Sequence, residues 1–131
     1  MTQNPVIQIR GYHLDVYGHV NNARYLEFLE EGRWAMFDGK VNLDEWRKDG
    51  LSFFVVNINI NYRRAAVLGD SIEVVSRIKE FGNKSGKINQ KIILAGTDTV
   101  CVDAEVTFVI VDESGKALPI KGNLKTLLEQ L

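Results

Sequence analysis

The chain has 131 residues, of which 45% are apolar and 25% charged, and its formal net charge is −1. This length suits one globular domain, and the small net charge excludes a global positive field that would hold nucleic acid or an anionic membrane. The first fifteen residues lack the basic start and apolar stretch of a signal peptide, and no apolar run is long enough to span a membrane. We therefore expect one cytoplasmic domain over residues 1–131.

The first part of the chain predicts a short strand and then one long helix. The strand is expected over residues 6–12. Asn21 and Asn22 offer a cap ahead of apolar residues that recur at helical spacing, which predicts a helix over residues 22–37. Gly32 lies inside this helix, where glycine costs about 1 kcal/mol relative to alanine. We therefore expect close packing against a sheet at that position.

The chain then alternates between apolar and polar residues as far as residue 111, which is typical of half-buried strands. In the first of these strands, the pattern predicts that Phe54, Val56 and Ile58 share the buried face, while three asparagines line the other. Short turns that contain glycine favour hairpins between neighbouring strands. The predicted elements are a short helix at 42–48, strands at 51–64, 71–81, 87–95 and 99–111, and a last helix at 124–130.

This order of elements predicts an α+β fold, in which about five antiparallel strands cover one long amphipathic helix. A small open sheet leaves unpaired strand edges, and pairing two copies edge to edge would satisfy them. We therefore expect a homo-oligomer, either a dimer or a tetramer built from two dimers.

The segment between the first strand and the long helix carries the candidate chemistry. A helix amino terminus presents free backbone N–H groups and the positive end of the helix dipole, so it stabilises negative charge on a carbonyl oxygen held there. The N–H of Asn22 is the expected donor. Asp15, on the turn before the helix, can reach the opposite side of the same carbonyl group and act as a nucleophile or as a general base toward water. A carboxylate and a free N–H on two sides of one carbonyl suit acyl transfer. An aspartate ahead of a helix is, however, more often a cap or turn residue.

Two motifs resemble a known family. The run Asp15-x-x-Gly18-His19-Val20-Asn21-Asn22-x-x-Tyr25, followed by Glu30 and Arg33, resembles the signature of the hotdog-fold thioesterases of the 4-hydroxybenzoyl-CoA thioesterase family. The likeness continues from Tyr62 to Asp70, except that this family often has proline where the chain has Arg64 and Ala65. The resemblance implies a sheet wrapped around a helix, joined sheets in dimers, frequent tetramers, and hydrolysis of acyl-CoA to free acid and CoA with neither a metal nor a separate cofactor.

The resemblance also implies roles for individual residues. Asp15 would be the catalytic carboxylate, the Asn22 N–H would polarise the thioester carbonyl, and Gly18 would let the thioester approach the turn. The residues expected to contact the substrate are His19, Val20, Asn21 and Tyr25, with Tyr25 lining the acyl pocket. Those expected to hold the phosphates of CoA are Arg63, Arg64, Lys84 and Ser85.

Several alternatives stay open from the sequence. His19 would otherwise cap the helix or pack in the turn, and the basic residues near the strand ends would otherwise serve solubility. Glu30 and Arg33 are three residues apart, so an ion pair between them explains both equally well. Cys101, the only cysteine, is expected to be buried. Two other functions compete with hydrolysis: a non-catalytic acyl-CoA-binding hotdog protein and a hotdog dehydratase acting on acyl-carrier substrates.

Overall fold

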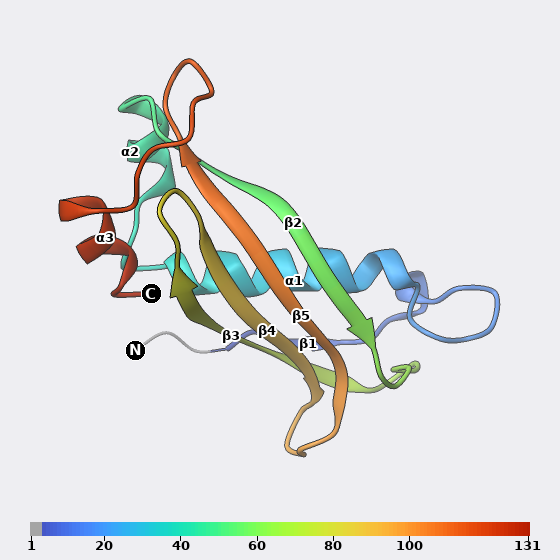
Figure 1. Cartoon of the computed structure of the whole chain (residues 1–131). Helices are drawn as coiled ribbons and strands as arrows, with labels where there is room; N and C mark the ends of the chain where they lie inside the picture. Colours follow the sequence, from blue (N-terminus) through green and yellow to red (C-terminus); the bar gives the residue numbers. More distant parts are fainter. Residues whose placement is uncertain (1–3) are drawn as a thin grey trace.

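The computed structural model describes residues 4–131 as a curved five-stranded antiparallel sheet wrapped around one long helix (Figure 1). The first three residues of the predicted domain 1–131 lie outside the described part. The elements in chain order are β1 (Val6–Gln8), a short 3-10 helix (Gly11–His13), α1 (Asn22–Phe37), α2 (Leu43–Lys48), β2 (Ser52–Tyr62), β3 (Ser71–Phe81), β4 (Gly86–Leu94), β5 (Val100–Val111) and α3 (Gly122–Leu128). The predicted α+β class, with about five strands around one long helix, is confirmed.

The helix α1 begins and ends where the sequence predicts. Asn21 caps it, because its Oδ1 accepts a hydrogen bond from the Ala23 N–H at 2.9 Å. Gly32 brings the helix close to the sheet, since a Cβ at this position would lie 2.5 Å from Cγ1 of Val74 and 2.9 Å from Nε2 of Gln90. The predicted reason for an interior glycine is therefore confirmed.

The strand order is β1-β3-β4-β5-β2, which puts β1 and β2 at opposite edges of the sheet. The hairpins predicted between β3 and β4 and between β4 and β5 are confirmed. The hairpin predicted between β2 and β3 is wrong, because these two strands are not neighbours in the sheet. Residues 63–70 do not close a hairpin because their backbone is bound to the segment around the start of α1. The Val20 N–H donates to the Ala66 carbonyl oxygen at 3.0 Å, and the Ala66 N–H donates to the Tyr25 hydroxyl at 3.0 Å. The strand β2 instead pairs with β5.

A β-bulge at Val56 changes the predicted faces of β2. Val55 and Asn57 pair with consecutive residues of β5, so Val56 is left without a partner there. The bulge shifts the alternation by one residue and moves Phe54 to the outer face, which it shares with Asn57. Phe54 and Val56 are 52% and 57% exposed, so the prediction that they are buried with Ile58 is wrong.

Two shorter elements differ from their predicted bounds. β1 is shorter than the predicted 6–12 because the chain turns at the 3-10 helix, where the His13 N–H donates to the Arg10 carbonyl oxygen at 3.0 Å. α3 begins at Gly122 rather than 124. No helix within residues 4–131 is both long and apolar enough to cross a lipid bilayer.

Candidate active site

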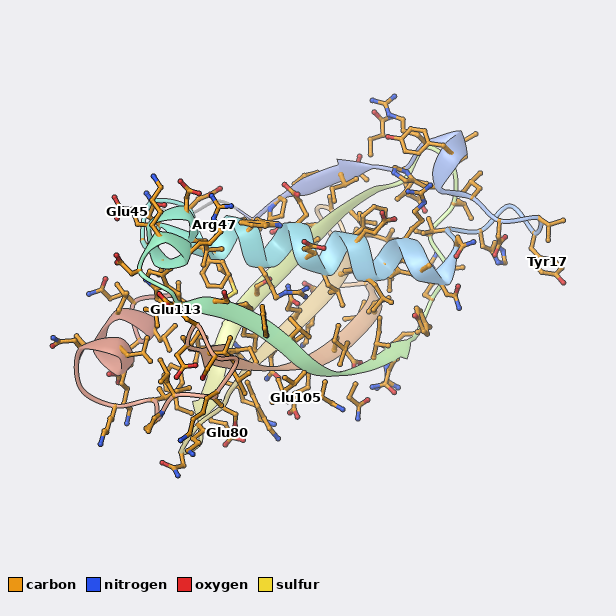
Figure 2. The ribbon with its side chains drawn as sticks, turned by 90° about the horizontal axis from the view of Figure 1, so that it is seen from above. Tyr17, Glu45, Arg47, Glu80, Glu105 and Glu113 are labelled. Atoms are coloured by element: carbon orange, nitrogen blue, oxygen red, sulfur yellow. The ribbon has the colours of Figure 1, made fainter. Side chains whose placement is uncertain are left out.

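The predicted catalytic segment forms a tight turn that extends beyond the amino end of α1 (Figure 1). The Asp15 N–H donates to the His19 carbonyl oxygen at 2.8 Å, and the Gly18 N–H donates to the Asp15 carbonyl oxygen at 3.1 Å. Gly18 has a φ of 76°, which glycine adopts without a steric penalty. Figure 2 shows Tyr17 at the tip of this turn, at the opposite end of the molecule from Arg47. The turn fixes Asp15 ahead of the helix.

Asp15 uses one of its two carboxylate oxygens to hold this turn. Its Oδ1 accepts hydrogen bonds from the N–H of Tyr17 at 2.9 Å and from the N–H of His19 at 3.3 Å. Its Oδ2 accepts no hydrogen bond from any residue between 4 and 131, and the side chain is half-buried. One oxygen therefore maintains the fold, and the other is available to a substrate or a water molecule.

The start of α1 presents an unused hydrogen-bond donor. The Ala23 N–H binds the side chain of Asn21, and the Arg24 N–H binds the Asn21 carbonyl oxygen at 2.9 Å. The Asn22 N–H, by contrast, has no acceptor in the described part of the chain. The Tyr62 hydroxyl donates to the Asn22 carbonyl oxygen at 3.2 Å, which ties the helix start to the end of β2. A free N–H at the positive end of a helix suits a developing oxyanion.

Two predicted substrate contacts have buried side chains. Val20 is 4% exposed and Tyr25 is 3% exposed. The Tyr25 hydroxyl accepts the Ala66 N–H, and burial raises the pKa of this tyrosine, so the hydroxyl stays protonated at neutral pH. Both residues hold the turn and the helix start against residues 63–70. His19 is exposed on the turn, and Asn21 serves as the helix cap.

The predicted phosphate contacts lie at two ends of the sheet. Arg63 and Arg64 follow β2, at the end where Tyr62 contacts Asn22. Nε of Arg63 donates to Oδ2 of Asp103 at 2.7 Å, which holds the pKa of that carboxyl below its usual value. The other two, Lys84 and Ser85, lie in the turn between β3 and β4, next to the Ser52 end of the sheet. One copy of the chain does not bring all four together.

His13 has a structural role. Its Nδ1 accepts the Arg10 N–H at 2.8 Å, and its carbonyl oxygen accepts the Asn21 N–H at 2.8 Å. The ring packs edge-on against Phe28 with 5.2 Å between centroids. Burial lowers the pKa of His13, so the neutral imidazole that accepts the Arg10 N–H is favoured.

The alternative of an ion pair between Glu30 and Arg33 is wrong. Glu30 instead accepts a hydrogen bond from Nε1 of Trp34 at 3.2 Å. Arg33 turns inward, and its Nη1 donates to Oε1 of Gln90 at 3.1 Å. Arg33 is 9% exposed, and burial lowers the pKa of its guanidinium. The sequence does contain a signal for this contact, because Gln90 occupies an inward position of its strand, in phase with Ile88.

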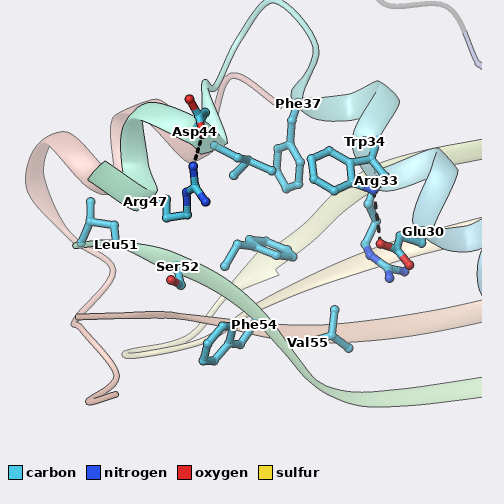
Figure 3. A pocket seen from close by; sticks show the side chains of 12 residues that line it. Glu30, Arg33, Trp34, Phe37, Asp44, Arg47, Leu51, Ser52, Phe54 and Val55 are labelled. Carbon is cyan, nitrogen blue, oxygen red and sulfur yellow. Dashed lines mark hydrogen bonds and ion pairs between the residues drawn. The ribbon is translucent and has the colours of Figure 1, made fainter. Parts of the chain in front are cut away.

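An apolar cavity of about 490 Å³ lies beside the second half of α1, and Figure 3 shows the side chains that line it. The last turns of α1, α2 and the first half of β2 form its walls. Most of its lining is apolar, from Trp34, Phe37, Leu43, Leu51, Phe53, Phe54 and Val55, and the polar lining comes from Glu30, Arg33, Asp44, Arg47 and Ser52. Glu30, the first residue of α1 in this lining, follows Asn22 by eight residues, which is about 12 Å along the helix. One copy of the chain therefore keeps the cavity apart from the catalytic turn.

The other candidate chemistries have little support in the described residues. Cys101 is buried, as predicted, and burial raises the pKa of its thiol, which disfavours the nucleophilic thiolate. Residues 4–131 hold no cluster of three or more His, Cys, Asp or Glu side chains placed to bind a metal ion.

A long helix enclosed by a curved antiparallel sheet, with an aspartate on the turn at its amino end, defines a hotdog-fold protein of the thioesterase class. The profile of the Thioesterase-like superfamily matches residues 9–129. The chain belongs to this superfamily, which confirms the resemblance seen in the two sequence motifs.

Similar proteins have the same fold and are described as thioesterases. The long-chain acyl-CoA thioesterase FadM of Escherichia coli (strain K12) is 50% identical over 129 residues, which cover 95% of this chain and 96% of FadM. The crystal structure of YbaW, a probable thioesterase from Escherichia coli, has a TM-score of 0.91 at 47% identity and covers 98% of this chain and 97% of its own. A probable thioesterase from Bartonella henselae has a TM-score of 0.76 at 25% identity, with coverage of 92% and 98%. The predicted hotdog fold is confirmed.

Proposed function

We propose that the protein hydrolyses acyl-CoA to a free carboxylic acid and CoA, with Asp15 and the start of α1 as its catalytic groups. Membership of the thioesterase superfamily and the 50% identity with FadM support the enzyme class. One observation carries the assignment of residues: the unused N–H of Asn22 lies at the helix start, just after a turn in which Asp15 keeps one carboxylate oxygen unbound.

In this mechanism the thioester carbonyl oxygen accepts the Asn22 N–H, which stabilises the negative charge that develops on the oxygen. Asp15 then acts in one of two ways. Its Oδ2 attacks the carbonyl carbon and expels the CoA thiolate, and water hydrolyses the resulting anhydride. Alternatively, Oδ2 takes a proton from a water molecule whose oxygen attacks the same carbon. Gly18 leaves the approach open, since a Cβ there would meet no atom within 4 Å.

We further propose that two copies join through β2, whose 11 residues have no partner on their outer edge in the described part of the chain. Antiparallel pairing of two β2 strands would set the Ser52 end of one copy beside the Tyr62 end of the other. Ser52 lines the apolar cavity, and Tyr62 contacts Asn22 at the helix start. The acyl chain of a substrate bound at one helix start would therefore enter the cavity of the second copy.

The same pairing suggests where CoA is held. Arg63 and Arg64 are exposed at the helix start of one copy. Lys84 and Ser85 lie toward the Ser52 end of the sheet, which the pairing brings to the same side from the second copy. Basic side chains bind phosphates through charge-assisted hydrogen bonds. All four predicted contacts would then serve one composite site, and CoA is needed only as part of the substrate.

The reaction is tested by thiol release from a series of acyl-CoA esters of increasing chain length. We expect release of CoA, with kcat/KM rising with chain length because each additional methylene enters the apolar cavity. A protein that binds acyl-CoA but releases no thiol from any ester would contradict hydrolysis and favour the binding alternative. Loss of water from hydroxyacyl substrates without thiol release would favour a dehydratase.

The oligomer is tested by light scattering. We expect a mass of two or four times the 14.8 kDa of one chain. Val56→Lys, on the open edge, is expected to shift the protein to monomers and to lower thiol release, because like charges would meet at the paired edge. Val6→Lys is the matched control, since Val6 is similarly exposed, at 60%, but lies on β1 at the other edge. Monomers of the unmutated protein, or dissociation by Val6→Lys alone, would contradict pairing through β2.

A further inference from the structure

We propose that the apolar cavity binds a long-chain free fatty acid, with the carboxylate on Arg33 and the aliphatic tail along the aromatic walls. This inference rests on the proposed function, because the free acid is the product of the proposed hydrolysis. Bound there, the acid occupies the space that an acyl chain needs, so it acts as a competitive product inhibitor.

The first argument is the charge of Arg33. The side chain is 9% exposed, and its hydrogen bond goes to the neutral amide of Gln90. No carboxylate of residues 4–131 lies within the 4.0 Å of an ion pair from the guanidinium. A buried cation is costly unless an anion compensates it. Arg33 therefore brings to the cavity wall a positive charge that no ion pair neutralises, and the charge of Glu30 acts on it only from beyond ion-pair distance.

Gln90 is neutral, and both its amide oxygen and its amide nitrogen are already hydrogen-bonded. Its Oε1 accepts from Arg33, while its Nε2 donates to the Leu29 carbonyl oxygen at 2.9 Å and to Oγ of Ser76 at 2.8 Å. The amide holds one nitrogen of the guanidinium in place. The other guanidinium N–H groups remain for a ligand, because arginine carries five such donors.

Neither acidic residue that lines the cavity forms an ion pair with Arg33. Glu30 accepts from Trp34 at 3.2 Å, and Asp44 pairs with Arg47 at 2.7 Å on the α2 side of the cavity (Figure 3). The Asp44–Arg47 pair is largely exposed, so its two charges compensate each other and are screened by water. Within the described lining, Arg33 is thus the cation that forms no ion pair, and Glu30 is the lining carboxylate whose charge acts on it.

The second argument is the chemistry of the remaining wall. Phe37, Phe53 and Leu51 line the same cavity as Arg33, and a volume of about 490 Å³ falls in the range of small-molecule pockets, about 300–1,000 Å³. An apolar wall with one buried cation is complementary to a molecule with one carboxylate and a hydrocarbon tail. Arginine binds a carboxylate through two parallel hydrogen bonds. A fatty alcohol or a methyl ester fills the same volume but forms no ion pair with Arg33.

The ligand series that tests this proposal needs no mutation. Trp34 lines the cavity, so its fluorescence reports binding. The unmutated protein is titrated, below the concentration at which micelles form, with tetradecanoic acid, tetradecan-1-ol and methyl tetradecanoate. We expect the acid to bind about 10- to 100-fold more tightly than the alcohol and the ester, as for a charge-assisted hydrogen-bond pair. Equal affinity for the three molecules would overturn the proposal.

Variants then locate the carboxylate. Arg33→Met is expected to remove the preference for the acid while it keeps binding of the alcohol, and Arg33→Lys is expected to retain part of the preference. Arg77→Met is the matched control, because Arg77 is exposed on the face of β3 opposite the helix. An unchanged preference in Arg33→Met, with a fold verified by circular dichroism, would overturn the assignment.

Thiol release measured on the same samples separates this inference from the proposed function. Hydrolysis of acyl-CoA with no preference for the acid would overturn the carboxylate site and leave the thioesterase mechanism intact. Selective binding of the acid with no thiol release from any ester would support the site and contradict the mechanism. In the active enzyme, tetradecanoic acid is expected to raise the KM for tetradecanoyl-CoA without changing kcat, and Arg33→Met is expected to weaken this effect.

Discussion

Asp15→Asn is expected to lower the rate of thiol release from acyl-CoA by about 10²- to 10⁴-fold, the usual contribution of a positioned acid or base. The substitution removes the carboxylate but leaves the turn intact, because an asparagine Oδ1 can still accept the N–H groups of Tyr17 and His19. The loss therefore reports chemistry rather than folding. Steady-state thiol release, with circular dichroism to verify the fold, is the measurement.

Two further variants complete this experiment. Asp15→Ala removes both the chemical group and the turn acceptor, so it is expected to be at least as slow as Asp15→Asn and less stable. Asp112→Asn is the matched control, because Oδ1 of Asp112 holds another turn by accepting the N–H groups of Ser114 at 2.9 Å and Lys116 at 3.0 Å. It is expected to keep full activity. Equal rates for the unmutated protein and both Asp15 variants would rule out a catalytic role for this carboxylate.

Gly32→Ala is expected to lower the free energy of unfolding by about 1–3 kcal/mol, the usual cost of overpacking a filled core. Helix propensity alone predicts the opposite, since alanine is favoured over glycine by about 1 kcal/mol inside a helix. Packing decides the sign here, because the new Cβ would lie 2.5 Å from Val74 and 2.8 Å from Oγ of Ser76. Urea denaturation measures the change.

The control for this effect is Gly11→Ala. A Cβ at Gly11 would meet no atom within 4 Å, so we expect a change of less than about 0.5 kcal/mol, as for other surface substitutions. Stabilisation by Gly32→Ala would show that α1 moves away from the sheet at little cost, and would contradict the close packing described above.

Local patterns predicted much of the fold. The bounds of α1 follow from the cap at Asn21 and from apolar residues at helical spacing, which are properties of the segment itself. The alternation along β3, β4 and β5 likewise depends on neighbours in the chain, and glycine-bearing turns join these strands. The resemblance added the curvature of the sheet around the helix. The helix bounds and the strand alternation were accessible from the sequence because each is determined within a few residues.

The features that the sequence did not reveal depend on contacts between distant segments. The bulge at Val56 exists only relative to β5, so no pattern within residues 51–64 shows it. The spacing of Glu30 and Arg33 allows an ion pair worth a few tenths of a kcal/mol. The buried amide of Gln90 takes Arg33 instead, from a strand 57 residues further along the chain.

In the candidate site, too, the sequence predicted some features and left others to the structure. The motif from Asp15 to Asn22 predicts a carboxylate and a helix start close together, and the structure places the turn directly ahead of α1. Which oxygen of Asp15 holds the turn, and which N–H of the helix is unused, follow only from the backbone of residues 14–24. The catalytic roles themselves stay predictions. The cavity has no motif, because α1, α2 and β2 build it together.

The strand order has a consequence for the newly made chain. β2 is complete once Tyr62 leaves the ribosome, yet its partner β5 begins only at Val100. Until β5 emerges, both edges of β2 are unpaired, and its start contains the apolar run from Phe53 to Val56. Unpaired apolar strands are prone to associate with other chains during synthesis. The strand that we propose joins two copies in the mature protein is thus prone to unwanted association while the chain is being made.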